Sequence, residues 1–320
     1  MSINNNNASK SQCTKHTVSL QDILKKYNNV RADGSVASSS TRQARRRILK
    51  QAFKFLNKRF PELEDATKFK ERHVVVLAEI WEKQKLSAAT IQTRFSTLRL
   101  FCGWLGKVGM VRKTECYISD PDLVKRSYVA TVDKSWSGNQ VDFAEILEKV
   151  KAKDAYVAIA LECMVEFGFR RKEAVMFTPH MSDEGILVKI SRGAKGGRKR
   201  VVPILTKSQK ELLIRAREFI KPGQTLASPG KNLKQSLRRF DYVMTTLQIT
   251  KLGLGVTGHG LRSEYAQNRL KKLTGHDAPI KNSLSCQDAD TDLQARKEIS
   301  AELGHSRISI TNTYFGKKKK

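Results

Sequence analysis

The chain has 320 residues, 39% of them hydrophobic and 28% charged, which supplies apolar material for folded cores and, at roughly 100–200 residues per domain, the length of two domains. Lys and Arg number 60 against 31 Asp and Glu, so the formal net charge is +29 and the expected partner is a polyanion such as nucleic acid. No stretch approaches the roughly 18 apolar residues of a membrane span, and the Asn-rich N-terminus lacks the apolar region of a signal peptide.

The five cysteines are scattered and form no CxxC pair, which excludes a disulfide framework and a zinc site of the usual spacing. A reduced compartment is expected, and with it a cytoplasmic, nucleoid-associated location. Cys102 and Cys163 lie in apolar helical runs and are predicted to be core residues. From charge alone, the alternative is a basic protein without a specific ligand, such as an architectural or ribosomal protein.

The first predicted elements are a flexible lead-in and a helix. Residues 1–40 are low in apolar content, although Leu20, Ile23 and Leu24 could form a short helix. Between Thr41 and Phe60, apolar residues recur at i, i+3 and i+4 opposite a basic face, which predicts an amphipathic helix.

Two more helices are predicted before the middle of the chain. The run at about 70–84 holds five consecutive apolar residues, so a buried strand is possible there, but its length and neighbours favour a buried helix. Ser87 is a suitable N-cap for the next helix, which Gly106 would end. Residues 41–127 are therefore predicted to form a small all-α domain with a DNA-facing basic surface; for many single Lys or Arg residues the alternative is a solvated face.

Residues 128–138 contain Ser and Gly and are predicted to be a linker. Residues 139–320 would form a second domain, mainly α with a small β-sheet. Its two strands are predicted at Gly185–Arg192 and Lys199–Leu205, because apolar residues alternate there on both sides of a Gly-rich turn.

Four segments of this second domain carry the residue types that phosphodiester transfer to a protein nucleophile needs. The reaction needs a hydroxyl that attacks phosphorus, fixed cations around the non-bridging oxygens, and an acid that protonates the leaving 5′ oxygen. Arginine suits the second role, because its planar, permanently charged group pairs bidentately with phosphate.

The first two segments supply cations. Gly168 can end an apolar helix and place Arg170 at the junction that follows, where Glu173 is able to cap or orient it. The Gly-rich turn 193–199 places Lys195 at a hairpin tip, and lysine is the cation that can give up a proton. Taken alone, the first pattern also describes a surface arginine and the second a mobile basic loop.

The other two segments supply histidines and a hydroxyl. His259 and Arg262 are three residues apart near a helix N-terminus, a spacing that suits a phosphate site. His305 precedes Tyr314 by nine residues, and Ser306 could cap the helix that carries the tyrosine. Taken singly, His259 could equally be a histidine that hydrogen-bonds a backbone carbonyl beside a surface arginine, and Tyr314 could equally be a tyrosine packed in the core or at an interface.

Together the four segments resemble the active-site pattern of the tyrosine recombinases, or phage-type integrases. GFRRKE resembles the family's G-L-R-x-S-E box, and AKGGRKRVVPI resembles its hairpin motif with an apolar-Pro-apolar end. HGLR fits H-x-L-R, and LGHSRISITNTY resembles the L-G-H-S box with its tyrosine nine residues after the histidine. The resemblance covers the second domain throughout, whereas the first domain resembles the family's SAM-like core-binding domain in pattern only.

The resemblance implies strand cleavage by a tyrosine, with formation of a 3′-phosphotyrosine and release of a 5′ hydroxyl. The two arginines would bind the scissile phosphate, Lys195 would protonate the leaving oxygen, His259 would assist proton transfer with the tyrosine, and His305 would hydrogen-bond the phosphate. The implied catalytic residues are Arg170, Lys195, His259, Arg262, His305 and the nucleophile Tyr314.

The resemblance implies that no cofactor or metal is needed, because the phosphotyrosine conserves the bond energy for rejoining. The implied partners are double-stranded DNA at specific sites, further copies of the chain in a tetramer on that DNA, and accessory DNA-bending or directionality factors. The implied role is integration and excision of a mobile element, as for integrases of integrative, conjugative or genomic-island elements.

Two features depart from the family pattern. The interval from Arg262 to His305 is 43 residues, and residues 274–290 are predicted to be an inserted polar loop. Six residues follow Tyr314, so the C-terminal helix that docks many relatives onto a neighbouring subunit is expected to be absent. Two alternatives stay open: an enzyme like the type IB topoisomerases, which would relax unrelated plasmids, and a non-catalytic DNA-binding protein derived from an integrase.

Overall fold

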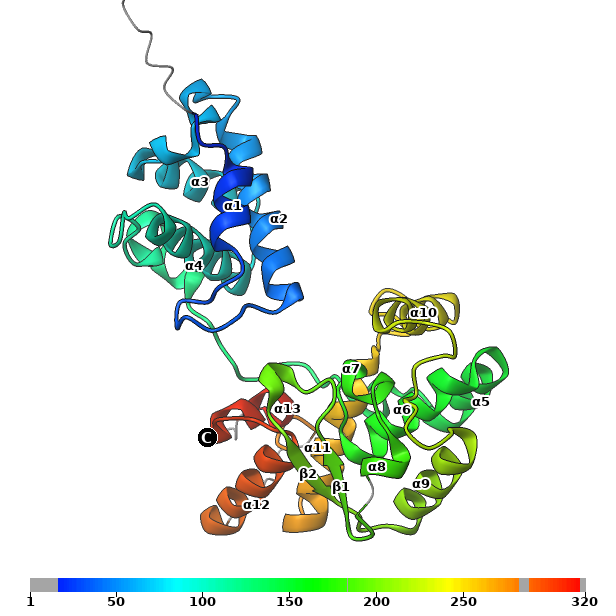
Figure 1. Ribbon diagram of the computed structural model, residues 1–320. Helices are drawn as coiled ribbons and strands as arrows, with labels where there is room; N and C mark the ends of the chain where they lie inside the picture. The colour runs from blue at the N-terminus through cyan, green and yellow to red at the C-terminus, as the bar shows by residue number, and fades with distance from the viewer. Residues whose placement is uncertain (1–16, 183, 282–287, 317–320) are drawn as a thin grey trace, which may run out of the picture. The chain divides into compact units, whose positions relative to one another are not determined.

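The computed structural model describes residues 17–182, 184–281 and 288–316, and the chain divides into two compact units (Figure 1). Unit 1 is Met1–Ser127 and unit 2 is Tyr128–Lys320. The predicted class, mainly helical with a small sheet, is confirmed, and no helix in the described ranges is long and apolar enough to cross a membrane.

Unit 1 is built from helices that pack around an aromatic and aliphatic core. The helices are α1 (Leu20–Tyr27), α2 (Ser39–Leu56), α3 (Glu71–Lys83) and α4 (Ala88–Trp104). Ser19, Ser38 and Ser87 accept hydrogen bonds from backbone N–H groups in the first turns of α1, α2 and α4, which satisfies donors that a helix start leaves open. The run at about 70–84 is thus a buried helix, as its length suggested.

The flexible lead-in was expected over residues 1–40, of which residues 1–16 lie outside the described part; residues 17–40 contain a helix. This helix is α1, and Ile23 and Leu24 are only 3% and 2% exposed because they pack into the core of unit 1. The capping box formed by Ser19 and Asp22 helps to start this short helix. The short helix suggested by Leu20, Ile23 and Leu24 is thus present, because apolar residues on one face of a short helix are stabilised when they pack into a core.

Unit 2 surrounds the apolar helix α6, which packs against α5, α9 and α11. Its helices are α5 (Phe143–Lys153), α6 (Ala155–Phe167), α7 (Arg171–Val175), α8 (Pro179–Ser182), α9 (Lys207–Phe219), α10 (Leu233–Thr246), α11 (Gly258–Thr274), α12 (Ala289–Glu302) and α13 (Asn312–Phe315). Cys163 is buried on α6 and Cys102 in unit 1, as predicted.

The predicted hairpin is present as β1 (Leu187–Ile190) and β2 (Arg200–Pro203), which pair antiparallel with Ile190 opposite Arg200. Three glycines with positive φ, Gly193, Gly196 and Gly197, shape the connection between the strands. Side chains on a strand alternate between its faces, and Arg200 and Val202 are the buried members of β2.

The stretch 128–138, predicted as a linker, is in its second half part of the unit 2 core. Trp136 is 1% exposed, and its indole Nε1 donates a hydrogen bond to the carbonyl oxygen of Thr257 at 2.9 Å. Gly260 is required beneath it, because a Cβ there would lie 2.3 Å from the carbonyl oxygen of Lys134. The Ser and Gly content suggested a linker, but burial of the large apolar surface of Trp136 is favourable enough to hold this segment in the core.

Candidate active site

The junction between α6 and α7 positions the first predicted arginine. Gly168 ends α6 with φ +60°, and a Cβ at that position would lie 2.6 Å from the ring of Tyr265. The backbone N–H of Arg170 donates to Glu173 at 2.7 Å, and its Nη1 donates to the same carboxylate at 2.8 Å. Glu173 therefore caps α7 and orients the guanidinium, as its spacing suggested, and leaves the Arg170 side chain about one quarter exposed.

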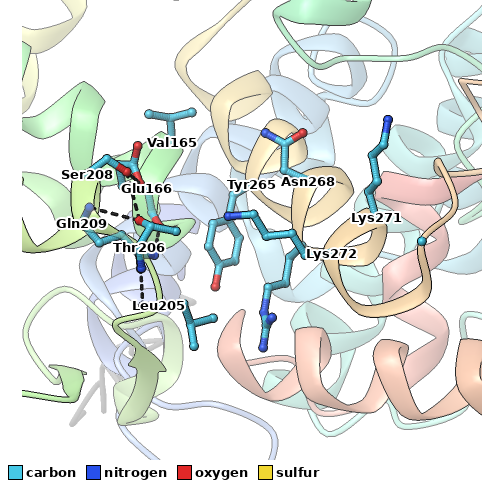
Figure 2. A pocket seen from close by; sticks show the side chains of 12 residues that line it. Val165, Glu166, Leu205, Thr206, Ser208, Gln209, Tyr265, Asn268, Lys271 and Lys272 are labelled. Atoms are coloured by element: carbon cyan, nitrogen blue, oxygen red, sulfur yellow. Dashed lines mark hydrogen bonds between the residues drawn. The ribbon is translucent and has the colours of Figure 1, made fainter.

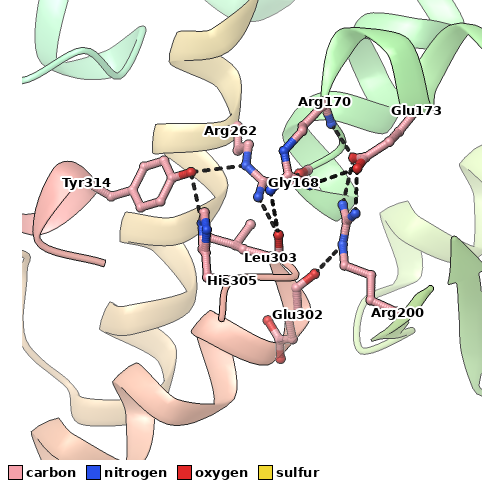
Figure 3. Close-up of polar contacts among 9 residues, drawn as sticks. All are labelled: Gly168, Arg170, Glu173, Arg200, Arg262, Glu302, Leu303, His305 and Tyr314. Carbon is pink, nitrogen blue, oxygen red and sulfur yellow. Dashed lines mark hydrogen bonds and ion pairs between the residues drawn. The ribbon is translucent and has the colours of Figure 1, made fainter. Parts of the chain in front are cut away.

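The second predicted arginine, Arg262, lies in the second turn of α11 and is fully buried. Its Nη1 donates to the carbonyl oxygen of Gly168, its Nη2 to that of Leu303, and its Nε to the hydroxyl of Tyr314 at 3.1 Å (Figure 3). Burial lowers the pKa of Arg262 to about 10, so the group stays cationic at neutral pH. Each terminal nitrogen carries a second N–H, so these bonds leave donors for a phosphate.

His259 lies one turn before Arg262 and is an exposed residue. Although the residue as a whole is exposed, the protein packed around its ring desolvates it, and this desolvation, together with the cations Arg262 and Lys134, lowers the pKa of the imidazole to about 4. The centre of the ring lies 6.3 Å from that of Tyr314. The imidazole is therefore neutral at pH 7 and able to accept a proton.

The predicted nucleophile is beside both of these residues. The hydroxyl of Tyr314 lies 3.2 Å from Nε2 of His305, which is half-buried, while Tyr314 itself is 4% exposed. The expectation that Ser306 caps the helix of Tyr314 is wrong: Ser306 is exposed, and α13 begins only at Asn312 without a side-chain cap. A 3-10 turn at Ile308–Thr311 separates the two, so Ser306 lies too early in the chain.

Hydrogen bonds from three parts of unit 2 hold α13 in place. Gln267 on α11 donates to the carbonyl oxygen of Tyr314 at 3.1 Å. Arg296 on α12 donates to the side chain of Asn312 at 2.9 Å, and the backbone N–H of Ala130 donates to the carbonyl oxygen of Asn312 at 2.9 Å. The tyrosine is thus fixed from both sides of its short helix.

Lys195 lies in the turn Lys195–Gly197 between β1 and β2, but its side chain lies outside the described part of the structure. The base of this turn touches the arginine junction, because a Cβ on Gly193 would lie 2.7 Å from the carbonyl oxygen of Lys172. The hairpin is therefore anchored next to Arg170.

One arginine that the sequence did not single out completes the cluster. Arg200 is 7% exposed, and its Nη1 and Nη2 donate to the two oxygens of Glu173 at 2.7 and 2.8 Å. Burial alone would raise the pKa of Glu173, but the hydrogen bonds and charge of Arg200, with those of Arg170, lower it to about 2. The available signal was position: Arg200 precedes buried Val202 by two residues and so shares its inward face.

Two cavities of unit 2 lie near this cluster, and only one of them is lined by a predicted site residue. One of about 410 Å³ is lined by Gly258 and His259 and by Arg171, so it opens beside the exposed histidine. The other, of about 540 Å³, lies between α6, α9 and α11 and is lined by none of the six predicted residues (Figure 2). The first cavity is the one that lies against the predicted site.

This arrangement suits a phosphate diester and a nucleophile. Two guanidinium groups converge on the carbonyl oxygen of Leu303, to which Arg170 Nη2 donates at 3.2 Å. A phenol hydroxyl and two imidazoles lie beside them. Fixed cations next to a hydroxyl are what nucleophilic attack on a phosphate requires.

Two protein families match parts of the chain. Residues 128–268 match the family described as integrase, and residues 22–111 match the one described as phage integrase, N-terminal. The two matches together cover more than two thirds of the chain. The chain belongs to the phage-type integrase family, the tyrosine recombinases. As an integrase, it has the family and fold of enzymes that cleave and rejoin DNA.

Solved integrases share its fold. A lambda integrase dimer bound to a COC′ core site is 16% identical, covering 93% of this chain and 77% of that chain, with a TM-score of 0.60. The lambda integrase tetramer bound to a Holliday junction is 15% identical, covering 94% and 78%, with a TM-score of 0.59. The Tn1549 transposon integrase in complex with circular intermediate DNA is 15% identical, covering 95% and 97%, with a TM-score of 0.57. No curated protein matches the chain.

Proposed function

We propose that this integrase is a site-specific DNA recombinase in which Tyr314 attacks the scissile phosphate. The bond formed joins the tyrosine oxygen to phosphorus, and the bond broken is that to the 5′ oxygen, which leaves as a hydroxyl. The observation that carries the proposal is the position of the Tyr314 hydroxyl, 3.1 Å from Arg262 and 3.2 Å from His305.

Each neighbouring side chain has a role that its environment supports. Arg170 and Arg262 hold the non-bridging oxygens of the phosphate, where negative charge accumulates. The neutral ring of His259 takes part in removing the proton of Tyr314, and His305 donates to the phosphate. Lys195, on the hairpin anchored beside Arg170, protonates the leaving oxygen. Rejoining reverses these steps without a cofactor or metal, because the phosphotyrosine keeps the bond energy.

The expected partner is double-stranded DNA carrying specific sites, bound by several copies of the chain. In unit 1, a groove of about 500 Å³ between α2 and α4 is lined by Arg45, Arg99 and Arg126. Arg46 and Lys50 are exposed on α2. The lambda integrases were solved as a dimer and as a tetramer on DNA, which supports an assembly of this kind here.

Covalent trapping tests the nucleophile. The substrate is a nicked duplex containing the ends of the element whose DNA encodes the chain, so that the short 5′ fragment diffuses away after cleavage and religation fails. The wild-type chain should form a denaturation-resistant protein–DNA adduct. Tyr314→Phe should form none while still binding the DNA, because the substitution removes only the attacking oxygen.

The matched control is Tyr156→Phe, a tyrosine that packs against Phe219. It should form the adduct at the wild-type rate. An adduct that survives in Tyr314→Phe would place the nucleophile elsewhere. A wild type that binds the site without forming an adduct would favour a non-catalytic DNA-binding protein, and relaxation of unrelated supercoiled plasmids would favour topoisomerase activity.

A further inference from the structure

Arg200 has no role in the proposed strand cleavage, yet it contacts two parts of the active site at once. It begins β2 and is buried. Its two terminal nitrogens grip Glu173 at 2.7 and 2.8 Å, and its Nε donates to the carbonyl oxygen of Glu302 at 2.6 Å (Figure 3). Burying such a charge costs desolvation, even though each of its three nitrogens donates a hydrogen bond, and therefore calls for an explanation.

The first consequence is electrostatic. Oε1 of Glu173 accepts from Nη1 of both Arg170 and Arg200, while Oε2 accepts from the Arg170 backbone and from Nη2 of Arg200. One carboxylate thus lies between two guanidinium groups, and the trio keeps one net positive charge. Without Arg200, Glu173 would neutralise Arg170 alone, and the pull of Arg170 on a phosphate would weaken.

The second consequence is geometric and concerns the turn that ends α12. The carbonyl oxygen of Glu302 accepts from Arg200, and that of the next residue, Leu303, accepts from Arg170 and Arg262. Gly304 follows with φ +63°, and a Cβ there would lie 2.9 Å from Cδ of Arg200. The arginine side chain therefore packs directly against the turn from which His305 emerges.

We propose that Arg200 is a positioning residue for strand cleavage: it balances Glu173 so that Arg170 stays available to the phosphate, and it fixes the turn that carries the Leu303 acceptor and His305. The proposal rests on the proposed function, since it assigns Arg200 to that reaction. It also ties the hairpin of Lys195 to the arginine cluster, because Arg200 is the first residue of β2.

The test compares two nicked substrates, one with the natural scissile phosphate and one with a neutral methylphosphonate at the same position. Arg200→Met removes the charge but keeps much of the volume, and Arg200→Lys keeps the charge but loses the bidentate grip. With the phosphate, single-turnover cleavage should fall about 100-fold in Arg200→Met and about 10-fold in Arg200→Lys, while DNA affinity stays within about twofold. With the methylphosphonate, relative to wild type on that substrate, the loss in Arg200→Met should shrink to about threefold, because little charge is left for Arg170 to balance.

A double variant keeps the test valid if Arg200→Met folds poorly. Arg200→Met combined with Glu173→Gln removes the unbalanced negative charge but keeps a side-chain oxygen that can accept from Arg170, so cleavage should be at least about tenfold faster than in Arg200→Met alone. Arg215→Met is the matched control: Arg215 pairs with Glu162 across α9 and α6, and its loss should leave cleavage unchanged.

Three results would overturn the role of Arg200. They are an equal loss on both substrates, a double variant no faster than Arg200→Met, and wild-type cleavage in both Arg200 variants. A failure of the proposed function looks different, because the wild type itself would then form no adduct on the natural phosphate, and the Arg200 variants would have no activity to lose.

Discussion

The two units of the chain bury different kinds of polar side chain. In the described part of unit 1, the buried polar residues are Asn28, His73, Thr97 and Thr114, and no Asp, Glu, Lys or Arg is among them. The described part of unit 2 buries six carboxylates and guanidiniums, which are Glu173, Arg200, Arg262, Glu264, Arg296 and Glu302. Unit 1 keeps its charge at the surface, whereas unit 2 brings charge inside.

Under the proposed function, the difference corresponds to two ways of binding a phosphate. A surface cation attracts DNA through solvent, and its contribution is screened by salt. A buried cation stabilises charge far more strongly, but only if partners offset its desolvation. Unit 2 supplies such partners: Glu302, for example, accepts from Tyr265 at 2.7 Å and from Arg269 at 2.9 Å. We therefore expect substitutions in unit 2 to change chemistry and folding, and those in unit 1 to change DNA affinity.

The largest effect is expected from Arg262→Lys. An ammonium keeps the charge but cannot reach Gly168, Leu303 and Tyr314 together, since it lacks the planar fork of arginine. Single-turnover cleavage of the nicked substrate should fall about 1000-fold, with DNA affinity reduced less than about threefold.

Arg215→Lys is the control for this prediction, because Arg215 forms an ion pair in unit 2 outside the cluster. It should cleave at close to the wild-type rate. If Arg262→Lys cleaved within about tenfold of the wild-type rate, a positive charge alone would suffice at position 262. The buried arginine would then act no differently from a surface cation of unit 1.

The next effect concerns stability. Glu173→Gln leaves Arg200 buried without its counter-ion, so unit 2 should lose about 3 kcal/mol of unfolding free energy at pH 7. The pKa of Glu173 is about 2 in the folded chain against a reference of 4.5, so its carboxylate stabilises the fold fully above pH 4.5 and progressively less as pH falls toward 2.

Denaturant unfolding at two pH values checks this prediction. Between pH 7 and pH 4 the wild type should lose about 1 kcal/mol more than Glu173→Gln, so the gap between the two narrows. A gap that widened toward pH 4 would contradict the depressed pKa. Equal stability of the two chains at pH 7 would mean that the buried carboxylate is not needed to balance the arginines.

Local spacing accounts for the parts of the site that the sequence predicted. A glycine after an apolar helix must end it, which placed Arg170, and a three-residue step on a helix puts His259 and Arg262 on one face. The hairpin followed from alternation around glycines. These inferences involve neighbours along the chain, and so a single sequence carries them.

The parts that could not be predicted depend on contacts between distant segments. Arg200 and Glu302 are 102 residues apart, and Trp136 lies 121 residues from the carbonyl that it contacts on Thr257. Neither spacing has a sequence signature, so Arg200 passed as one more cation of a basic hairpin and Trp136 as part of a linker. Hydrogen bonds between residues so far apart in the chain can be identified only from the folded structure.

The smallest effect is expected in unit 1, from Arg46→Gln and Lys50→Gln on α2. Both residues are exposed, so their loss should not alter the fold. If each contacts one DNA phosphate, each substitution should reduce the slope of log K against log salt by about one. The measurement is DNA affinity at several salt concentrations.

Arg72→Gln separates a contact from a change in net charge. Arg72 is also an exposed unit 1 arginine, but it pairs with Glu62, so its charge is already balanced and its loss should leave the salt slope unchanged. An unchanged slope in Arg46→Gln and Lys50→Gln would mean that this face of α2 points away from DNA. If the salt slope decreased equally in all three variants, DNA binding would depend only on the total charge of unit 1. Contacts with defined phosphates on α2 would instead lower the slope in the two α2 variants and not in Arg72→Gln.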